Sequence, residues 1–139
     1  VIHVPWITYV PGAPPGVSVP GPASLVDVVP TVLGLTGLVS SRQSEGEDLS
    51  RYLLTLSGAP RDPNSGPVFS ESRESGQVVH AVRFGDYKLV RNTNGGERFY
   101  DVTGTEREIM TARGRQDRVR LDLSDMLNRR LAGQLRGRP

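Results

Sequence analysis

Residues 77–91, which read QVVHAVRFGDYKLVR, decide the fold of the second half of this 139-residue chain. Two runs rich in β-branched and aromatic residues lie on either side of the dipeptide Gly85-Asp86. A two-residue connection that contains glycine, placed between two such runs, is typical of a tight β-hairpin. The stretch therefore predicts adjacent antiparallel strands over residues 77–84 and 87–91.

Two further β-type runs and one helical pattern surround this hairpin. Residues 67–72 and 97–102 are short runs of the same kind, each separated from the hairpin by turn-forming residues. Apolar residues then recur every four positions from Val119 to Leu135, which is the pattern of an amphipathic helix. Such a helix covers one face of a sheet. We therefore predict that residues 67–139 form a small α+β unit, with a four-stranded antiparallel sheet and one long helix.

The first sixty residues have a different pattern, which is typical of an α/β domain. Residues 1–10 are rich in β-branched and aromatic residues and stop at a Pro-Gly turn, so they predict a buried strand that needs neighbouring strands. Residues 24–38 predict a short helix that ends at Gly37 and is buried on more than one side. A second short helix is predicted from Asp48 onward. Helices of this kind commonly flank a parallel sheet.

Residues 61–66, RDPNSG, are turn-forming or charged and offer no apolar anchor, so they are the predicted linker. Residues 1–60 are accordingly assigned to the end of an α/β domain, and residues 67–139 to the small unit. The hydrophobic fraction of 36%, together with 16 glycines and 11 prolines, is low for a self-sufficient globule. A complete compact enzyme is therefore not expected from this chain.

Charge and apolar patterning argue against two classes of partner. The net charge is only +2, and the arginines of residues 113–130 alternate with aspartates at helical spacing. This alternation favours a salt-bridged helix face, and no aromatic residues are interleaved to stack on bases, so nucleic-acid binding is not expected. The chain has no run of about 18 apolar residues, so no membrane span is expected. Because it has no cysteine, the cellular compartment stays open.

Seven segments, in order along residues 1–108, resemble the sulfatase family. They are VPWITYVPG, SLVDVVPTVLGLTGL, GEDLSRYL, VFSES, VRFGDYKLV, RFYDV and TEREI. Each motif alone is weak evidence, so the resemblance depends on their order and spacing. One departure is residues 104–108, GTERE, where sulfatases usually have an acidic stretch of the type DP-E.

The resemblance implies both a fold and an activity. The fold is the C-terminal end of an alkaline-phosphatase-like α/β sandwich domain over residues 1–60, followed by the small α+β subdomain. The activity is hydrolysis of a sulfate ester on a small molecule or a glycan. Sulfatases are typically periplasmic or secreted, which is the location that the resemblance suggests.

The same resemblance places the chemistry outside this chain. Sulfatases use a formylglycine made from the Cys or Ser of a C/S-x-P-x-R sequence, and no such sequence occurs here. They also hold a divalent cation, usually Ca²⁺, through oxygen ligands. We expect nucleophile and ligands to precede Val1, which is not an initiator methionine, so that this chain binds no metal and is inactive alone.

Two alternative functions are compatible with these residues. One is a phosphonate monoester or phosphodiester hydrolase of the same superfamily, because sulfur and phosphorus transfer need similar charge stabilisation. The nucleophile and the metal ligands of the upstream region would distinguish it from a sulfatase. The other is a non-catalytic, degenerate relative that retains the small unit as an interaction surface.

Only a few side chains are candidates for contact with a substrate. His3 and His80 are the only imidazoles and are the candidates for the substrate rim, because histidine titrates near neutral pH. The alternative for both is a structural strand histidine. Glu71, Arg73 and Glu74 form a mixed-charge cluster that could orient an anion, or simply a solvated turn.

Two further predictions concern side chains that look functional and are interpreted as structural. Lys88 lies between Tyr87 and Leu89 and is predicted to point to the opposite side from both, as a solvent-facing strand lysine. Trp6 and Tyr9 are predicted to be core residues of a buried strand.

Overall fold

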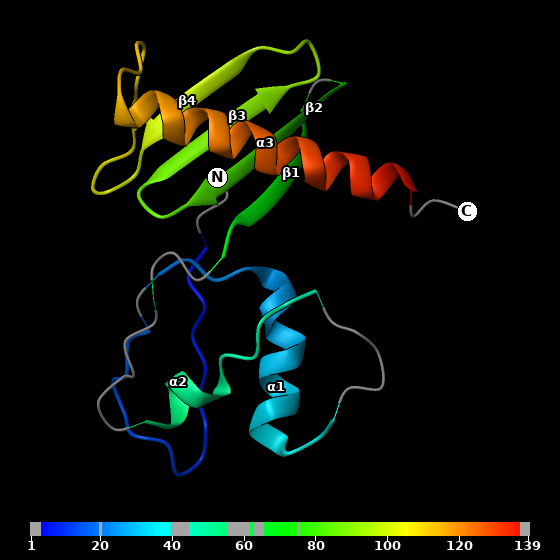
Figure 1. The fold of residues 1–139 in the computed structure, drawn as a ribbon. Helices are drawn as coiled ribbons and strands as arrows, with labels where there is room; N and C mark the ends of the chain where they lie inside the picture. Colours follow the sequence, from blue (N-terminus) through cyan, green and yellow to red (C-terminus); the bar gives the residue numbers. More distant parts are fainter. Residues whose placement is uncertain are drawn as a thin grey trace. The chain divides into compact units, whose positions relative to one another are not determined.

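The computed structural model describes residues 4–19, 21–39, 45–55, 62, 66–74 and 76–136 (Figure 1). The chain divides into two compact units, residues 1–65 and residues 66–139. The first unit contains the 3₁₀-helix η1 (Leu25–Asp27) and the helices α1 (Val28–Thr36) and α2 (Ser50–Leu54). The second contains the strands β1 (Val68–Glu74), β2 (Gln77–Phe84), β3 (Tyr87–Asn92), β4 (Glu97–Asp101) and β5 (Arg107–Glu108), and the helix α3 (Arg115–Arg136).

The second unit is built on one antiparallel sheet with the strand order β1-β2-β3-β4-β5. The hairpin predicted from residues 77–91 is confirmed, because β2 and β3 pair with Phe84 opposite Tyr87. Gly85 in the connecting turn has φ of 55°, a left-handed conformation that glycine adopts without a steric penalty. The sheet is thus a simple meander in which each strand pairs with its neighbour in sequence.

The predicted count of four strands is wrong, because β5 adds a fifth strand beside β4. Tyr100 lies opposite Glu108, and Asp101 lies opposite Arg107. The Ile109 N–H also donates to the Phe99 carbonyl at 2.7 Å. Residues 104–108 are polar and show no alternation, so their sequence carries no strand signal. The pairing rests on backbone hydrogen bonds and on an exposed ion pair between Arg107 and Asp101 at 3.8 Å.

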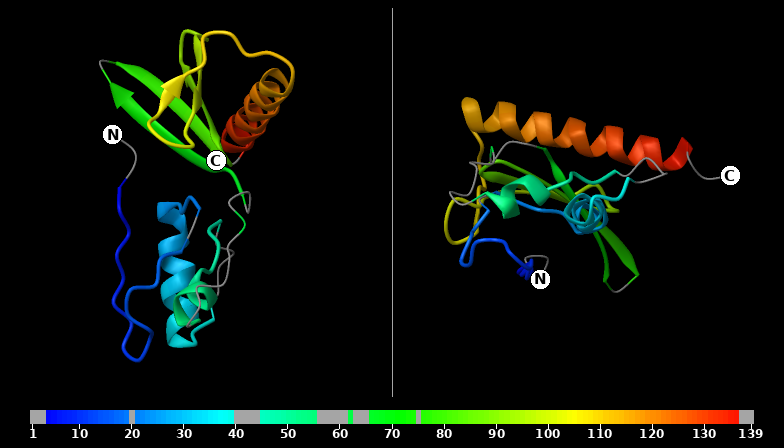
Figure 2. Two further views of the ribbon diagram at one scale, coloured as in Figure 1. Left: turned by 90° about the vertical axis from the view of Figure 1, so that its left-hand side faces the viewer. Right: turned by 90° about the horizontal axis from the view of Figure 1, so that it is seen from below.

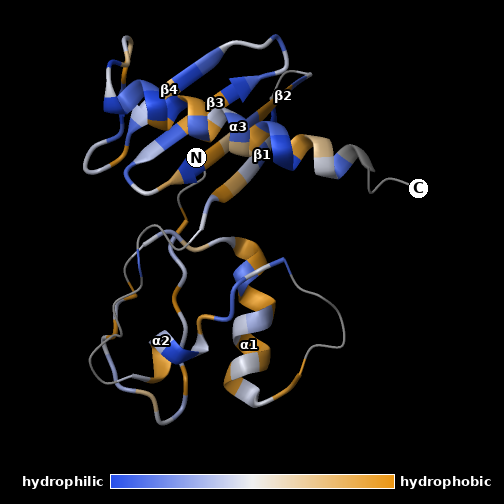
Figure 3. Ribbon diagram, in the orientation of Figure 1, coloured by the Kyte–Doolittle hydropathy of each residue, from blue (hydrophilic) through white to orange (hydrophobic). Residues whose placement is uncertain are grey.

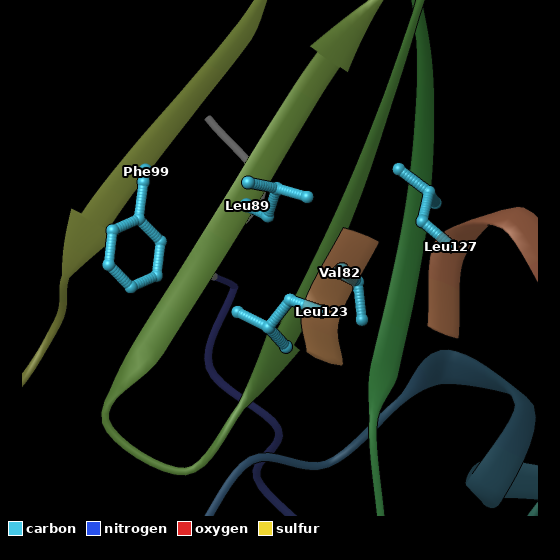
Figure 4. Close-up of a cluster of buried hydrophobic side chains, with 5 residues drawn as sticks. All are labelled: Val82, Leu89, Phe99, Leu123 and Leu127. Carbon is cyan, nitrogen blue, oxygen red and sulfur yellow. The ribbon is translucent and has the colours of Figure 1, made fainter. Parts of the chain in front are cut away.

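The core of the second unit lies between the sheet and α3 (Figure 2, left). Antiparallel register places Phe69 opposite Val82, Val82 opposite Leu89, and Leu89 opposite Phe99, so that one apolar row crosses four strands. Two leucines of α3 complete the cluster. Figure 4 shows its five buried members, Val82, Leu89, Phe99, Leu123 and Leu127.

The helix α3 begins earlier than predicted. The apolar repeat started at Val119, whereas the helix starts at Arg115 and continues to Arg136. Its first turn is polar and contains Asp117, whose charge suits the positive end of the helix dipole. None of the described helices is long and apolar enough to cross a lipid bilayer.

In the first unit the predicted helix end is confirmed. Gly37 has φ of 69° and closes α1, its N–H donating to the Gly34 carbonyl, while the Leu38 N–H donates to the Leu33 carbonyl. These are the bonds that satisfy carbonyl groups at a helix C-terminus. The second predicted helix is α2, which is short and buries Tyr52.

The predicted strand and the predicted burial of α1 both required neighbouring strands, which the described residues do not provide. Residues 4–10 form no regular strand, and Trp6 and Tyr9 are exposed, Tyr9 to 89%. A strand needs a hydrogen-bonding neighbour, and the described residues of this unit supply none. Helix α1 is also not buried on several sides: Val29 and Val32 are exposed, because its principal contacts are with η1 and α2. Figure 3 shows the hydrophobic residues along α1.

Leu89→Ala tests the core of the second unit. Leu89 has no exposed surface, so its truncation should lower the free energy of unfolding by roughly 2–5 kcal/mol. Leu121→Ala is the matched control, because Leu121 is 52% exposed on α3, and we expect a change within about 0.5 kcal/mol. Urea unfolding followed by circular dichroism measures both variants. Equal effects would contradict the assigned core.

Candidate functional site

A row of polar side chains runs beside the apolar row, on the face of the sheet that α3 covers. Glu71 lies opposite His80, His80 opposite Arg91, and Arg91 opposite Glu97. Side chains two positions apart on a strand share one face, so this row is the direct neighbour of the one containing Val82 and Leu89. The sheet therefore places His80, a candidate from the sequence, between a carboxylate and a guanidinium.

His80 lies in a shallow hollow at the β1–β2 side of α3. Its side chain is 19% exposed, and its Nδ1 lies 3.6 Å from Glu71 Oε2. The hollow has a volume of about 200 Å³ and a mixed lining that includes Phe69, Leu127 and Arg130. The Arg130 guanidinium lies over the Phe69 ring at 5.7 Å. Such a site can accept a small polar group, but the row supplies charged and imidazole groups rather than a hydroxyl or thiol nucleophile.

The other sequence candidates are placed as follows. His3 and the side chain of Glu74 lie outside the described residues. Glu71 and Arg73 do form an ion pair at 3.8 Å, and the Arg73 side chain is 75% exposed. An exposed pair of this length contributes little to stability.

Lys88 is on the opposite face of the sheet from Leu89, as predicted, but it does not face open solvent. It pairs with Glu106, and its ammonium group lies 4.9 Å from the centre of the Tyr100 ring. Only 16% of its side chain is exposed. The interpretation as a solvent-facing lysine is therefore wrong, because a carboxylate and an aromatic ring cover the amine.

The other half of the polar row fastens α3 to the sheet. Arg91 donates to Glu97 Oε1 through Nε at 2.9 Å and through Nη2 at 2.6 Å. It also donates to Asn128 Oδ1 and to Ser124 Oγ, both at 2.7 Å. Arg120 reaches the second oxygen of Glu97 at 3.3 Å. This network was not predicted, because its members lie as much as 37 residues apart in sequence.

The predicted ion pairing along α3 is confirmed at two places. Arg120 pairs with Asp117 at 3.3 Å, and Arg129 pairs with Asp125 at 3.9 Å. Both pairs lie one helical turn apart, where side chains on a helix surface meet. The helix surface thus has part of its arginine charge neutralised by its own aspartates.

The divalent cation implied by the resemblance was tested against the residues present. Within residues 4–136, apart from the gaps named above, no group of three or more His, Cys, Asp and Glu side chains is placed to hold a metal ion. A hard cation such as Ca²⁺ needs six to eight oxygen ligands. These residues do not fit such a site, so no chemical step is assigned to a cation here.

In the first unit, Asp27 and Thr31 join two of the segments that carry the resemblance. The Asp27 carboxylate is buried and accepts hydrogen bonds from the Ser24 N–H at 2.7 Å and the Glu47 N–H at 2.9 Å. The Thr31 hydroxyl is fully buried, donates to the Asp27 carbonyl at 2.6 Å and accepts from the Leu49 N–H at 3.0 Å. Buried polar groups need such partners. Both side chains therefore hold loop 46–49 against the start of α1.

Gly46 is required for this junction. A Cβ atom on Gly46 would lie 2.1 Å from the Val26 carbonyl oxygen, a backbone atom that cannot move aside. A Cβ on Gly34 would similarly lie 2.2 Å from the Asp48 carboxylate. Residues 27–31 (DVVPT) and 46–48 (GED) thus form a structural junction. Sequence reasoning did not find it, although a lone Asp and Thr beside an apolar helix were the available signal.

Thr31→Val tests this junction. The substitution keeps the β-branched shape and leaves the Leu49 N–H without its acceptor, so we expect a loss of about 1–3 kcal/mol in the free energy of unfolding. Thr36→Val is the control, because that exposed hydroxyl only bonds carbonyls within α1, and its effect should stay within about 0.5 kcal/mol. Urea unfolding followed by circular dichroism measures both variants.

Asp101, at the end of β4, has a lowered pKa. The main cause is the hydrogen bond from the Thr103 hydroxyl at 2.7 Å, followed by the Thr103 N–H at 2.9 Å, while the charge of Arg107 contributes less. Because the folded-state pKa is depressed, this group stabilises the fold above its ordinary pKa. The contribution is lost as the pH falls through the lowered value.

Thr103→Val should raise the Asp101 pKa toward its ordinary value, because the hydroxyl donor is removed while the backbone donor remains. Arg107→Gln should raise it less. A ¹³C NMR titration of the Asp101 carboxyl carbon measures both shifts. A larger change in R107Q than in T103V would contradict the assigned cause.

Comparison with known proteins finds sulfatases. The chain is 26% identical over 130 residues to "Arylsulfatase K" of Danio rerio, which covers 90% of this chain and 25% of that protein. It is also 26% identical over 91 residues to "Sulfatase" of Formosa agariphila, which covers 66% of this chain and 17% of that protein. No protein-family model and no solved structure matches the chain significantly.

The chain is thus similar to sulfatases over much of its length, as the order of its motifs indicated. It spans a quarter or less of the length of the curated relatives it matches. The described hollow, polar row and junction contain no metal cluster, and the histidine at the hollow is paired with one carboxylate.

Proposed function

We propose that this chain is the C-terminal portion of a sulfatase that hydrolyses sulfate esters of small molecules or glycans. The observation that carries the proposal is the similarity to two sulfatases, one of which is matched over nine-tenths of this chain. The order of seven motifs within the same residues agrees with this similarity. The hydrolase chemistry, with its formylglycine and its cation, is assigned to the part of the parent protein that lies outside this chain.

The exposed apolar side chains of the first unit support this proposal. Ile7 and Tyr9 are each 89% exposed, and Val29 on α1 is 63% exposed. Apolar surfaces of this kind mark an interaction site or a missing packing partner. In an alkaline-phosphatase-like α/β sandwich, further sheet and helix layers would cover them, which is the fold that we propose for residues 1–60 with the rest of the parent domain.

In this proposal the described residues act as scaffold. The junction at Asp27 and Thr31 fixes the end of the α/β domain, and the network around Arg91 fixes α3 on the sheet. His80 and its hollow are the candidate for contact with a substrate at the rim of the parent active site. Ca²⁺ is the proposed cation of that active site. The parent enzyme is proposed to be periplasmic or secreted.

The proposal is tested with the complete product of the coding sequence that contains this chain. We expect that product to hydrolyse an aryl sulfate, to lose activity when Ca²⁺ is chelated, and to regain it when Ca²⁺ is restored. The 139-residue chain alone is the matched comparison and should give no turnover above buffer.

Two outcomes would overturn the proposal. Turnover of the aryl sulfate by the 139-residue chain alone would show that the active site is in this chain. Rapid hydrolysis of an aryl phosphonate monoester by the complete product, with no activity on the sulfate, would assign it to the phosphorus-directed branch instead.

A further inference from the structure

The face of the sheet opposite α3 presents a second set of side chains. Strand register aligns Val68, Arg83, Lys88 and Tyr100 in one row, and Ser70, Ala81, Val90 and Arg98 in the next. In this unit α3 packs against β2 and β3 from the other side, and no described element of the unit lies over this face (Figure 2, left). We name it the open face.

The open face carries cations in an unfavourable arrangement. Arg83 and Lys88 lie directly opposite each other on neighbouring strands, where like charges destabilise a sheet. Arg98 lies on the same face, two residues from Tyr100, the partner of Lys88. Lys88 is compensated by Glu106, so one of the two facing cations already has an anion.

Arg83 has no such compensation. It forms no ion pair with any residue that the structure describes, and its Nε is buried without a hydrogen-bond acceptor. A guanidinium binds a carboxylate through two parallel N–H groups, so a carboxylate is the natural complement to a buried Nε–H. The missing partner of Arg83 is therefore chemically defined.

The centre of the open face is apolar. Ala81 is only 4% exposed, and Val79 and Val90 beside it are half-buried. Apolar side chains at the centre, with charged groups at the border, are the arrangement found at protein–protein interfaces. A small neutral ligand would supply no carboxylate to Arg83. An acidic protein surface can bind Arg83 and also cover the apolar centre of the open face.

We propose that the open face docks onto an acidic surface of the parent protein outside this chain, with a carboxylate of that surface bound to Arg83. The inference rests on the proposed function, because that function makes this chain one part of a larger polypeptide. Charge complementarity at Arg83 selects the occupant. The relatives are long enough to contain such a surface outside the matched region, since this chain covers 25% of the arylsulfatase it matches.

The test measures accessibility of the open face in the complete protein. This chain contains no cysteine, so single thiols can be introduced by Ser72→Cys on the open face and by Asp125→Cys on α3. Both positions are exposed within their unit. Labelling with iodoacetamide, quantified by peptide mass spectrometry, should be at least tenfold slower in S72C than in D125C.

Arg83 is tested in the same background. Adding Arg83→Gln to S72C should raise its labelling rate at least threefold, because the bound carboxylate loses its charged partner. Arg118→Gln, which changes an exposed arginine on α3, should leave the rate unchanged. If R83Q does not fold, Arg83→Lys replaces it; lysine keeps the charge but not the paired N–H groups, so a smaller rise is expected.

The outcomes separate this inference from the proposed function. Equal labelling of S72C and D125C would overturn the docking. So would protection that disappears on dilution together with a dimer in sedimentation, because a second copy would then cover the face. Aryl sulfate turnover measured on the same samples reports the proposed function independently. If the S72C thiol is protected and no turnover is seen, only the proposed activity is overturned.

Discussion

The second unit depends on the register of its antiparallel strands. A two-residue hairpin turn at Gly85 fixes Phe84 opposite Tyr87, and every other pair between β2 and β3 follows from that one. A slip by one residue would exchange the two faces, because side chains alternate along a strand. Val82 and Leu89 would then face away from α3, and the helix would lose the apolar row that forms the buried core.

The same register determines the polar chemistry of both faces. On the helix side it brings Arg91 beside Glu97, close enough to Ser124 and Asn128 for one guanidinium to bind sheet and helix together. On the open side it places Arg83 against Lys88, where only one of the two cations has a carboxylate. On the open face Lys88 has a carboxylate partner and Arg83 has none among the described residues, which is why this face is interpreted as an interface.

The hairpin and the helix of the second unit could be predicted because their signals are local in sequence. Features that depend on pairing between distant residues could not be predicted. The hairpin and the helix have periodicities that act within a few residues, so they could be read directly. Residues 4–10 have the composition of a strand, but a strand forms only with a partner, and composition does not supply one. β5 shows the converse, since polar residues become a strand when β4 offers its edge. His80 was placed on the correct strand, while its carboxylate partner depended on register.

The first unit shows why a family resemblance and a catalytic site need not coincide. Asp27 and Thr31 are polar residues next to an apolar helix, and in an enzyme such residues invite a catalytic interpretation. Their hydrogen bonds instead go to the backbone of Ser24, Glu47 and Leu49. Gly46 is fixed by contact with a carbonyl oxygen rather than by a ligand. The junction needs these residues in order to close, so they explain the local fold of the first unit, and their contacts assign no chemistry to it.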